Sequence, residues 1–308
     1  MLDNCKFFIL AGGYGKRAQP LSLIKPKPLF PLGGTPLIKI LLEQLQEKGL
    51  GEGLINLHYM PGPLRRCVEE TIERPGSPTI RFLVEKKLSG SRILKEAAPH
   101  MMDNDLLLVL NGDMFLEIPA ATMRSQLLHN DVDGILLVRK NKEKDSQYKI
   151  IRTADDFFSG RRVWDHREIE PGAEPLMYTG AALFKKKVVR AIDEINFFDM
   201  LARGNFRIKT VVYDGIWLDI GDPRSYMEAN FAYKAYLKNN AGDSNCLSAK
   251  VTISADSLVE HSVIWENTRI INASVLENCL VTGNISLDNV HYRNKIINRD
   301  SIEAGIML

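Results

Sequence analysis

Apolar positions in the first 130 residues form short continuous runs that are separated by longer amphipathic segments. Continuous apolar runs are typical of strands buried on both faces, and we expect them at 6–11, 53–59, 79–85 and 105–113. Apolar residues that recur on one face predict helices at 36–49 and 63–76, and a short one at 92–98. This alternation predicts an α/β fold with a doubly wound, mostly parallel sheet.

The pattern is less regular after about residue 140. Residues 139–147 are expected to form a charged loop, and strands are expected at 148–154, around 162–164, at 176–184 and within 207–221. Asp222 and Pro223 supply an N-cap and a first-turn proline for a helix that runs to about Lys238. Residues 239–245 have the composition of a linker, so we expect one catalytic domain over residues 1–240.

Beyond the linker, single aliphatic residues recur at steps of five or six. They are Ile253, Leu258, Ile264, Ile270, Leu276, Val281 and Leu287. A six-residue period is typical of a parallel β-helix, in which each flat face contributes one inward side chain. A small β-sandwich is the alternative, but alternation at period two is weak here. We therefore predict a short β-helix of hexapeptide repeats over residues 246–308.

Composition limits the class of protein. The chain of 308 residues is 45% hydrophobic and 25% charged with a net charge of +2, the balance of an ordinary globular protein. This charge gives no argument for binding nucleic acid or membrane. The four cysteines are scattered, which predicts reduced thiols and a cytoplasmic location. No stretch of about 18 apolar residues predicts a membrane span.

The candidate chemistry begins at residues 9–28, ILAGGYGKRAQPLSLIKPKP. The letters of residues 13–18 fit the glycine fingerprint of a dinucleotide-binding turn. That turn opens a helix, which Pro20, Pro26 and Pro28 exclude. A Walker loop is excluded as well, because the lysine of such a loop is followed by Ser or Thr, whereas Lys16 is followed by Arg17. A glycine loop and a proline-stiffened arm remain.

Charged residues accompany this loop and arm. Four cations, at Lys16, Arg17, Lys25 and Lys27, favour a polyphosphate ligand over an isolated surface role. Asp113 and Asp219 each follow an apolar run, so both are expected at strand ends. Two such carboxylates suit Mg²⁺, which otherwise takes phosphate oxygens and water.

At this point a family resemblance becomes specific. The run LAGGYGKRAQPLSLIKPKPLFPLGGTPLI resembles the signature of the sugar-1-phosphate nucleotidyltransferases, the NDP-sugar pyrophosphorylases. The similarity continues in family order at Glu85, VLNGD (109–113), YTG (178–180) and WLDIGDPRSYMEAN (217–230). The C-terminal repeat resembles the left-handed β-helix of mannose-1-phosphate guanylyltransferase-like members. The resemblance implies a Rossmann-like nucleotidyltransferase sheet with a small C-terminal left-handed β-helix.

The resemblance also implies a reaction and a set of roles. A sugar 1-phosphate attacks the α-phosphorus of a nucleoside triphosphate, giving an NDP-sugar and pyrophosphate. Arg17 and Lys27 are the implied catalytic residues. The implied nucleotide-binding residues are Ala11, Gly12, Gly13, Gly15, Glu85, Gly90 and Asp113. The implied sugar-binding residues are Gly112, Thr179 and Gly180, and the implied Mg²⁺ ligands are Asp113 and Asp219.

Three departures from the family pattern leave an alternative open. Lys16 replaces a Ser or Thr, and the E-K-P motif is reduced to Glu170-Pro171. Residues 88–94, LSGSRIL, stand where the family has L-G-T-A-G-A-L, so Arg92 occupies a glycine position. His166 has no motif context and is expected at the surface. The best interpretation is an enzyme that uses GTP and mannose 1-phosphate or a related sugar, as a homo-oligomer; the alternative is a weakly active paralogue that regulates a partner.

Overall fold

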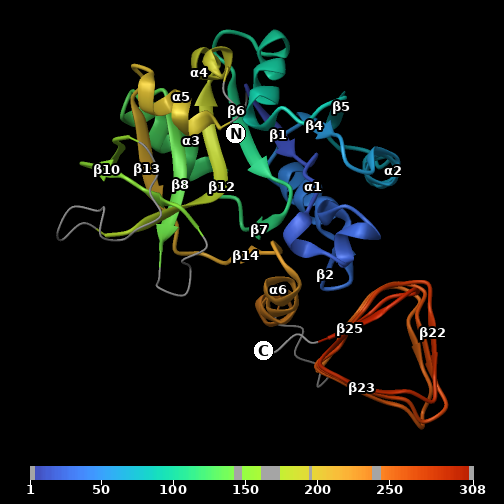
Figure 1. Cartoon of the computed structure of the whole chain (residues 1–308). Helices are drawn as coiled ribbons and strands as arrows, with labels where there is room; N and C mark the ends of the chain where they lie inside the picture. Colours follow the sequence, from blue (N-terminus) through green and yellow to red (C-terminus); the bar gives the residue numbers. More distant parts are fainter. Residues whose placement is uncertain (1–3, 142–147, 161–173, 194–195, 238–243, 305–308) are drawn as a thin grey trace. The chain divides into compact units, whose positions relative to one another are not determined.

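The computed structural model describes residues 4–141, 148–160, 174–193, 196–237 and 244–304. Contacts between residues divide the chain into two compact units (Figure 1). The first, called here the sheet unit, comprises Met1–Gly13, Leu41–Gly112 and Leu116–Trp217. The second, called the β-helix unit, comprises Tyr14–Ile40, Asp113–Phe115 and Leu218–Leu308. The chain passes from one unit to the other several times.

The sheet unit is built on one sheet of ten strands. Its strands are β1 (Cys5–Leu10), β4 (Glu52–Leu57), β5 (Thr79–Val84), β6 (Leu106–Asn111), β8 (Gly134–Lys140), β9 (Ile150–Ile151), β10 (Thr153–Ala154), β11 (Phe157–Phe158), β12 (Leu176–Lys185) and β13 (Ile208–Val212). Their order is β10-β11-β13-β8-β12-β6-β1-β4-β5, and β9 pairs with β12. Strands β5, β4, β1 and β6 run parallel, as do β13 and β8, whereas β12 is antiparallel to both of its long neighbours.

Helices cover both faces of this sheet. They are α1 (Leu37–Glu47), which begins in the β-helix unit, α2 (Pro61–Ile72), the 3₁₀ helix η4 (Gly90–His100), α3 (Ala120–His129), α4 (Lys186–Ala191) and α5 (Phe197–Arg203). One cluster of buried apolar residues joins η4, α4 and α5 to one face of the sheet. Side chains alternate between the faces of a strand, so Phe7 and Leu108, which are also fully buried, point to the other face. The predicted doubly wound α/β architecture is confirmed.

The β-helix unit begins with the proline-rich segment. It contains the 3₁₀ turns η1 (Lys16–Ala18), η2 (Leu21–Leu23) and η3 (Lys27–Leu29), and the short strands β2 (Pro31–Leu32) and β3 (Thr35–Pro36). Helix α6 (Pro223–Tyr236) starts after the cap that the sequence predicts, with Asp222 accepting a hydrogen bond from the backbone of Ser225. Strands β7 (Met114–Leu116) and β14 (Trp217–Asp219) pair in a two-stranded sheet.

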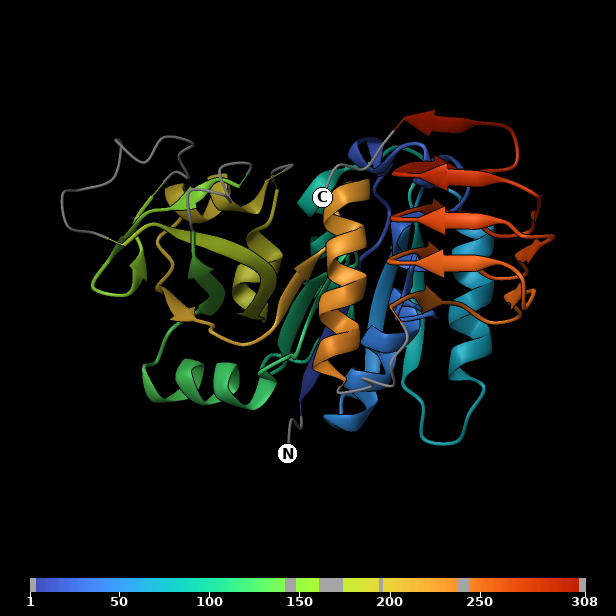
Figure 2. The same ribbon diagram turned by 90° about the horizontal axis from the view of Figure 1, so that it is seen from below.

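The C-terminal strands form the expected parallel β-helix, which appears as a triangle along its axis in Figure 1 and as stacked coils in Figure 2. Its three faces are β15 (Cys246–Leu247), β18 (Val263–Ile264), β21 (Leu280–Val281) and β24 (Lys295–Ile297); β16 (Thr252–Ile253), β19 (Arg269–Ile271) and β22 (Ser286–Asp288); and β17 (Leu258–Glu260), β20 (Val275–Glu277) and β23 (His291–Arg293). Strand β25 (Ile302–Ala304) turns back antiparallel on β24. Aliphatic side chains from all three faces fill the interior.

Asparagines make the corners of the β-helix. Asn267, Asn278, Asn284 and Asn294 all have positive φ, a conformation that asparagine tolerates better than most residues. Asn267 donates a hydrogen bond to Asn284 at 3.1 Å, one coil further on. Residues in equivalent positions are 17 or 16 apart along the chain, so a coil is one or two residues shorter than three strict hexapeptides. One predicted interior residue is wrong: Leu258 is exposed, and Val259, which is in register with Leu276, packs against the interior in its place.

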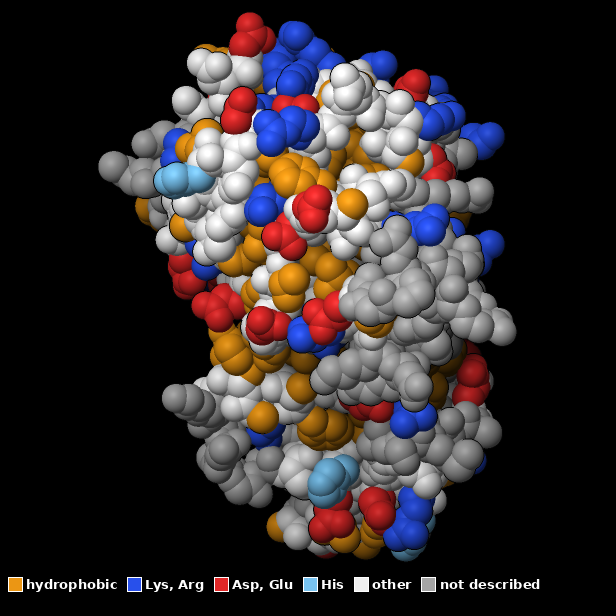
Figure 3. Space-filling model, turned by 90° about the vertical axis from the view of Figure 1, so that its left-hand side faces the viewer, with side chains coloured by type: hydrophobic (Ala, Val, Ile, Leu, Met, Phe, Trp, Pro, Cys, Tyr) orange, Lys and Arg blue, Asp and Glu red, His pale blue; other side chains and the backbone are white. Residues whose placement is uncertain are grey.

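Two further expectations concern the surface and the cysteines. Cys5, Cys67, Cys246 and Cys279 are all described and all free, as predicted. Lys and Arg side chains lie among Asp and Glu side chains on the face shown in Figure 3, in keeping with the small net charge. Among the described residues, none of the helices has the length and apolar character that crossing a bilayer requires.

Candidate functional site

The glycine loop and the proline-rich arm lie against one another in the β-helix unit. Gly15 has a φ of +64°, which favours glycine, and a Cβ added there would lie 3.0 Å from the Cβ of Ser22 and 3.2 Å from the Cγ of Lys27. A larger residue would therefore push the arm away. Gly15 contributes to the predicted site by letting the stem of Lys27 approach the loop.

Lys27 is the central cation of this arm. Its side chain is only 8% exposed, and its Nζ lies 3.3 Å from a carboxylate oxygen of Asp113. Pro26 and Pro28 flank it and fix the backbone torsions on both sides. The backbone of the η3 turn then closes with the amide of Phe30 donating to the carbonyl of Lys27 at 2.9 Å. The sequence-predicted pair Lys27 and Asp113 is thus brought into contact.

Asp113, Asp219 and Arg17 belong to the same unit. The amide of Ile220 donates to the carbonyl of Asp113, so Asp219, the residue before Ile220, lies on the strand that runs beside the Asp113 segment. A Cβ added at Gly221 would lie 2.6 Å from Oδ2 of Asp219 and 3.0 Å from Nη2 of Arg17. The Arg17 guanidinium and the Asp219 carboxylate therefore approach the same point. Four of the predicted residues form one charged cluster, called here the phosphate cluster.

The chemistry of this donor set suits a magnesium ion that is shared with substrates. Mg²⁺ is commonly held by one or two carboxylates and completes its shell with phosphate oxygens and water. Asp113 and Asp219 supply two carboxylates. Within the described part of the chain, no group of three or more His, Cys, Asp or Glu side chains could hold a metal without such help.

A second set of predicted residues lies in the sheet unit, where hydrogen bonds to Glu85 connect its members. The backbone amide of Ala11 donates to Asn56 at 2.7 Å, and the amide of Asn56 donates to Glu85 at 2.6 Å. The other oxygen of Glu85 accepts hydrogen bonds from the backbone and the hydroxyl of Ser89. Glu85 thereby links the end of β1 to the loop that precedes Gly90. Its nucleotide contact remains a prediction.

Asn56, which no motif indicates, and Ser89, which lies in the LSGSRIL stretch, are the hydrogen-bond partners of Glu85. Gly12 also depends on Asn56, because a Cβ added there would come within 2.7 Å of the Asn56 amide nitrogen. A Cβ at Gly13 would meet no atom within 4 Å, so packing does not explain that glycine. A bare backbone that faces open space is what a ligand that approaches the loop closely would require.

Arg92, the largest departure from the family pattern, has a defined partner. It is exposed, and its Nε donates a hydrogen bond to the carbonyl of Asp193 at 2.8 Å. Gly90 begins η4 with a φ of +62°, and the Ser91 hydroxyl accepts from the amide of Phe197. The side chains of Ser91 and Arg92 are therefore directed to the segments around α4 and α5.

The sugar-binding candidates are built into the sheet. Thr179 is fully buried, its hydroxyl donates to the carbonyl of Leu137, and its own carbonyl accepts from the indole of Trp217. The pairing of β12 with β8 shifts register here, and Gly180 has a φ of +90°. Gly112 packs against β1, since a Cβ there would lie 2.9 Å from the carbonyl oxygen of Leu10. The sugar contacts of these three residues stay predictions.

Lys25 and Lys16, two of the expected cations, differ from Lys27. Lys25 pairs with Glu266 of the β-helix, so its charge is balanced by a carboxylate of the protein. Lys16 is exposed, 5.9 Å from the ring centroid of Tyr14. His166 and Glu170-Pro171, together with the strand expected at 162–164, lie outside the described residues.

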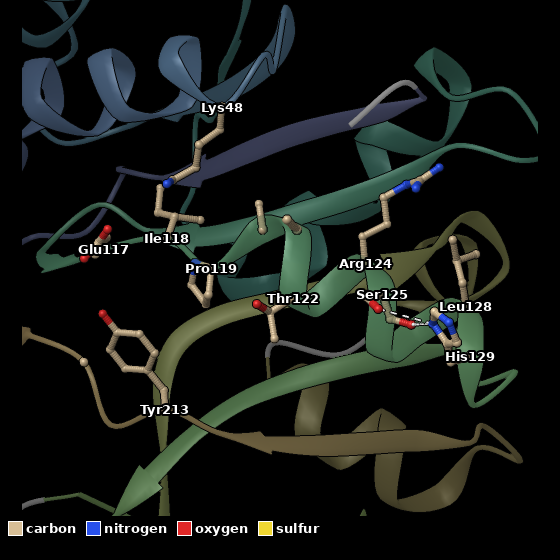
Figure 4. Close-up of a pocket in the computed structure, with 13 residues that line it drawn as sticks. Lys48, Glu117, Ile118, Pro119, Thr122, Arg124, Ser125, Leu128, His129 and Tyr213 are labelled. Carbon is tan, nitrogen blue, oxygen red and sulfur yellow. Dashed lines mark hydrogen bonds between the residues drawn. The ribbon is translucent and has the colours of Figure 1, made fainter. Parts of the chain in front are cut away.

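A pocket of about 670 Å³ lies elsewhere in the sheet unit. Lys48 follows α1, Thr122 comes from α3 and Tyr213 follows β13 around it (Figure 4). No predicted site residue lines this pocket. Its position gives no support to the predicted chemistry, which rests on the two clusters described above.

Comparisons with known proteins agree with the geometry. A family model described as nucleotidyl transferase matches residues 6–235. A putative mannose-1-phosphate guanyltransferase from Sulfolobus acidocaldarius is 27% identical over 284 residues, which are 89% of this chain and 74% of that protein. A probable mannose-1-phosphate guanylyltransferase 1 from Oryza sativa subsp. japonica is 27% identical over 244 residues, 77% of this chain and 66% of that protein.

Solved structures share the fold. HddC from Yersinia pseudotuberculosis superimposes with a TM-score of 0.61 at 22% identity, over 74% of this chain and 99% of that one. A putative glucose-1-phosphate thymidylyltransferase from Bacillus anthracis gives a TM-score of 0.62 at 18% identity, over 75% of this chain and 95% of that one. These matches confirm the fold that the sequence predicts.

Proposed function

This chain belongs to the nucleotidyl transferase family, and we propose that it transfers a nucleoside monophosphate from a nucleoside triphosphate to a sugar 1-phosphate. The family match confirms the enzyme class that the sequence predicts. GTP and mannose 1-phosphate, or a related sugar, are the proposed substrates, because relatives such as the Sulfolobus protein are named mannose-1-phosphate guanyltransferases. The observation that carries the proposal is the contact of buried Lys27 with Asp113, in the unit that also holds Arg17 and Asp219.

The chemistry asks little of the protein beyond positioning and charge. An oxygen of the sugar phosphate forms a bond to the α-phosphorus, and the bond from that phosphorus to the bridging oxygen of pyrophosphate breaks. Lys27 would neutralise charge on the α-phosphate and the attacking phosphate, and Arg17 would hold the leaving pyrophosphate. Asp113 and Asp219 would hold Mg²⁺, which when bound supplies further positive charge to the phosphate oxygens.

Several predicted nucleotide-binding residues lie in the sheet unit. The open backbone at Gly13 supports a close approach of the nucleotide, and the Glu85 network supports a fixed loop before Gly90. Arg92 was the main reason to consider a weakly active regulator. Its hydrogen bond to Asp193 accounts for this side chain without a ligand, which favours the enzyme.

A pyrophosphate-release assay tests the proposal. Four nucleoside triphosphates would be combined with several sugar 1-phosphates in the presence of Mg²⁺, and turnover is expected for GTP with mannose 1-phosphate or a close relative. Arg17→Ala and Asp113→Ala should each lower turnover about a hundredfold or more, because each removes a charge that stabilises the transition state. Arg17 is exposed, so the melting temperature of Arg17→Ala should change little. Asp113→Ala removes the carboxylate that pairs with buried Lys27, so a lower melting temperature is expected for that variant and is measured beside the rate.

The matched control is Arg224→Ala, since Arg224 is an exposed arginine of the same unit that pairs only with Glu228 among the contacts of the described residues. This variant should retain the wild-type rate. Full activity of Arg17→Ala or Asp113→Ala would contradict the assigned roles. Failure of every substrate pair, with nucleotide binding retained, would favour the regulator.

A further inference from the structure

The proline-rich arm, residues 20–31, is anchored on the β-helix close to Lys27. The ammonium group of Lys25 pairs with the carboxylate of Glu266 and lies 4.5 Å from the ring centroid of Trp265. The Lys25 side chain is 16% exposed, so this contact is largely shielded from water. A cation that faces both an aromatic ring and a carboxylate in such a place is held firmly. Lys25 is two residues from Lys27.

A second anchor holds the other end of the arm. Trp265 follows Ile264, which points into the β-helix, and alternation directs the indole outward. Trp265 is nevertheless fully buried, because Phe30 packs against it with ring centroids 5.3 Å apart. An outward-facing tryptophan on a β-helix is therefore used as a contact with the arm.

Hydrogen bonds complete this second anchor. The Trp265 indole donates to the hydroxyl of Tyr226 at 2.9 Å, and that hydroxyl donates to the carbonyl of Pro31. Burial raises the pKa of the Tyr226 phenol well above its ordinary value, so the hydroxyl keeps its proton and can donate. Phe30 also packs edge-on against Tyr226 at 5.2 Å.

We propose that Trp265 and Glu266 are positioning residues for Lys27, so that one turn of the β-helix sets the geometry of the phosphate cluster. The two anchors hold Lys25 and Phe30–Pro31, and Lys27 lies between them with its Nζ on Asp113. A loosened anchor would move the Lys27 ammonium relative to the phosphates that it must contact. This proposal rests on the proposed function, because it assigns a consequence for catalysis.

Hydrogen–deuterium exchange combined with steady-state kinetics tests it. The variants are Glu266→Gln, Trp265→Phe and Lys25→Met, and Lys25→Arg is the conservative change that keeps the charge over the ring. The control is Glu277→Gln, which breaks a more exposed pair with Arg293 in the same β-helix. Thermal melting of each variant separates a local effect from general destabilisation.

The first three variants should speed exchange at the amides of Leu29 and Phe30, which close the η3 turn. They should lower kcat about tenfold to a hundredfold with a smaller change in KM, as a displaced catalytic group does. Lys25→Arg and Glu277→Gln should keep wild-type values of both. A merely structural role would lower the melting temperature without this selective loss of kcat and without rescue by arginine.

Two results would overturn the proposal. One is unchanged exchange in the arm of Glu266→Gln and Trp265→Phe. The other is faster exchange with an unchanged kcat, because the anchor would then not position Lys27. Inactivity of the wild-type protein on every substrate pair would instead refute the proposed function, while the exchange data would still report whether the β-helix holds the arm.

Discussion

Glu85 shows that a predicted binding residue can also hold its neighbours in place. Its carboxylate accepts hydrogen bonds from Asn56 and from the backbone and side chain of Ser89. Asn56 in turn fixes the amide of Ala11 at the end of β1. The Asn56 side chain and the amide and hydroxyl of Ser89 all donate to Glu85, and the two oxygens of a carboxylate can accept from all of them.

The substitution Glu85→Gln tests this arrangement. One oxygen becomes an NH₂ group, which faces a donor and leaves a buried group unsatisfied. Since Glu85 is buried, the free energy of unfolding should fall by about 1–3 kcal/mol. Urea denaturation measures this change. The control is Glu96→Gln on the exposed side of η4, which should stay within about 0.5 kcal/mol of wild type.

Equal unfolding free energies for Glu85→Gln and the wild type would show that the network contributes nothing. If the substitution destabilises only the loop before Gly90, amide exchange should become faster at Ser89. The backbone of Ser89 donates to Glu85 at 2.9 Å.

The sequence motifs predicted which charged residues belong to the site. They did not indicate most of the residues that hold those side chains in place. Lys27 and Asp113 were expected in one site, and they are in contact. The partner of Lys25 is 241 residues away, and no local pattern indicates such a pair. The hydrogen bond from Ala11 to Asn56 likewise joins residues 45 apart, which no local pattern reveals, whereas Ser89 is only four residues from its partner Glu85.

Among the elements, helix α6 depends on its first turn. Asp222 accepts a hydrogen bond from the amide of Ser225 at 2.9 Å, and the amide of Asp222 donates in turn to the Ser225 hydroxyl. Pro223 occupies the first helical position. These hydrogen bonds form a capping box, which satisfies amides that would otherwise lack a partner. The helix also carries Tyr226 and Asn230, whose side chains bind the backbone of Pro31 and Gly33.

Asp222→Ala should therefore lower the free energy of unfolding by about 1 kcal/mol, within the range for loss of an N-cap. Chemical denaturation provides the measurement. Asp222→Asn retains an acceptor and should lose less. Glu228→Ala on the exposed face of the same helix is the matched control, because its pair with Arg224 is largely exposed and should contribute little. If Asp222→Ala behaved like the control, the cap would be irrelevant to stability.

Strands were predicted in the regular part of the chain and also in the less regular part, where β12 and β13 lie, but several elements were missed. The continuous strands β1, β4, β5 and β6 lie within a few residues of their expected positions. Helix α3 and strand β8 were not predicted, and residues 139–140, expected in a charged loop, end β8 instead. Arg139 lies over the ring of Trp217 at 4.8 Å, so its charge is accommodated at the end of the strand. Tertiary contact of this kind overrides local composition.

At the scale of the whole molecule, the β-helix contributes to two apolar cores. One is its own interior, and the other is shared with the proline-rich arm and helix α6. The interior of the β-helix is lined by aliphatic residues from its three faces. Trp265 lies outside that core and packs with Phe30 and Tyr226, all three fully buried. Residues 14–40 and 218–308 accordingly form one compact unit. Linear order along the chain does not show that the proline-rich arm and the C-terminal repeat share a core.

Two views of the C-terminal repeat make different predictions. The end of a short β-helix exposes an apolar edge unless it is paired or capped, so a role of the repeat in oligomerisation or regulation is one proposal. If that were its only role, deletion of residues 246–308 would change the oligomeric state and leave the stability and turnover of the remaining chain as they were.

The shared core predicts a more severe result for this deletion. Loss of Trp265 would expose Phe30 and Tyr226, and removing a large buried aromatic typically costs about 3–5 kcal/mol. The truncated chain should melt roughly 6–20 °C lower, bind more of a hydrophobic dye and lose most of its turnover. A shorter deletion, residues 299–308, is the control: it removes β25 and spares Trp265 and Glu266, so it should keep the arm in place. Light scattering on both proteins reports the oligomeric state separately. A truncated chain with the melting temperature and kcat of the full chain would mean that the arm does not need the β-helix.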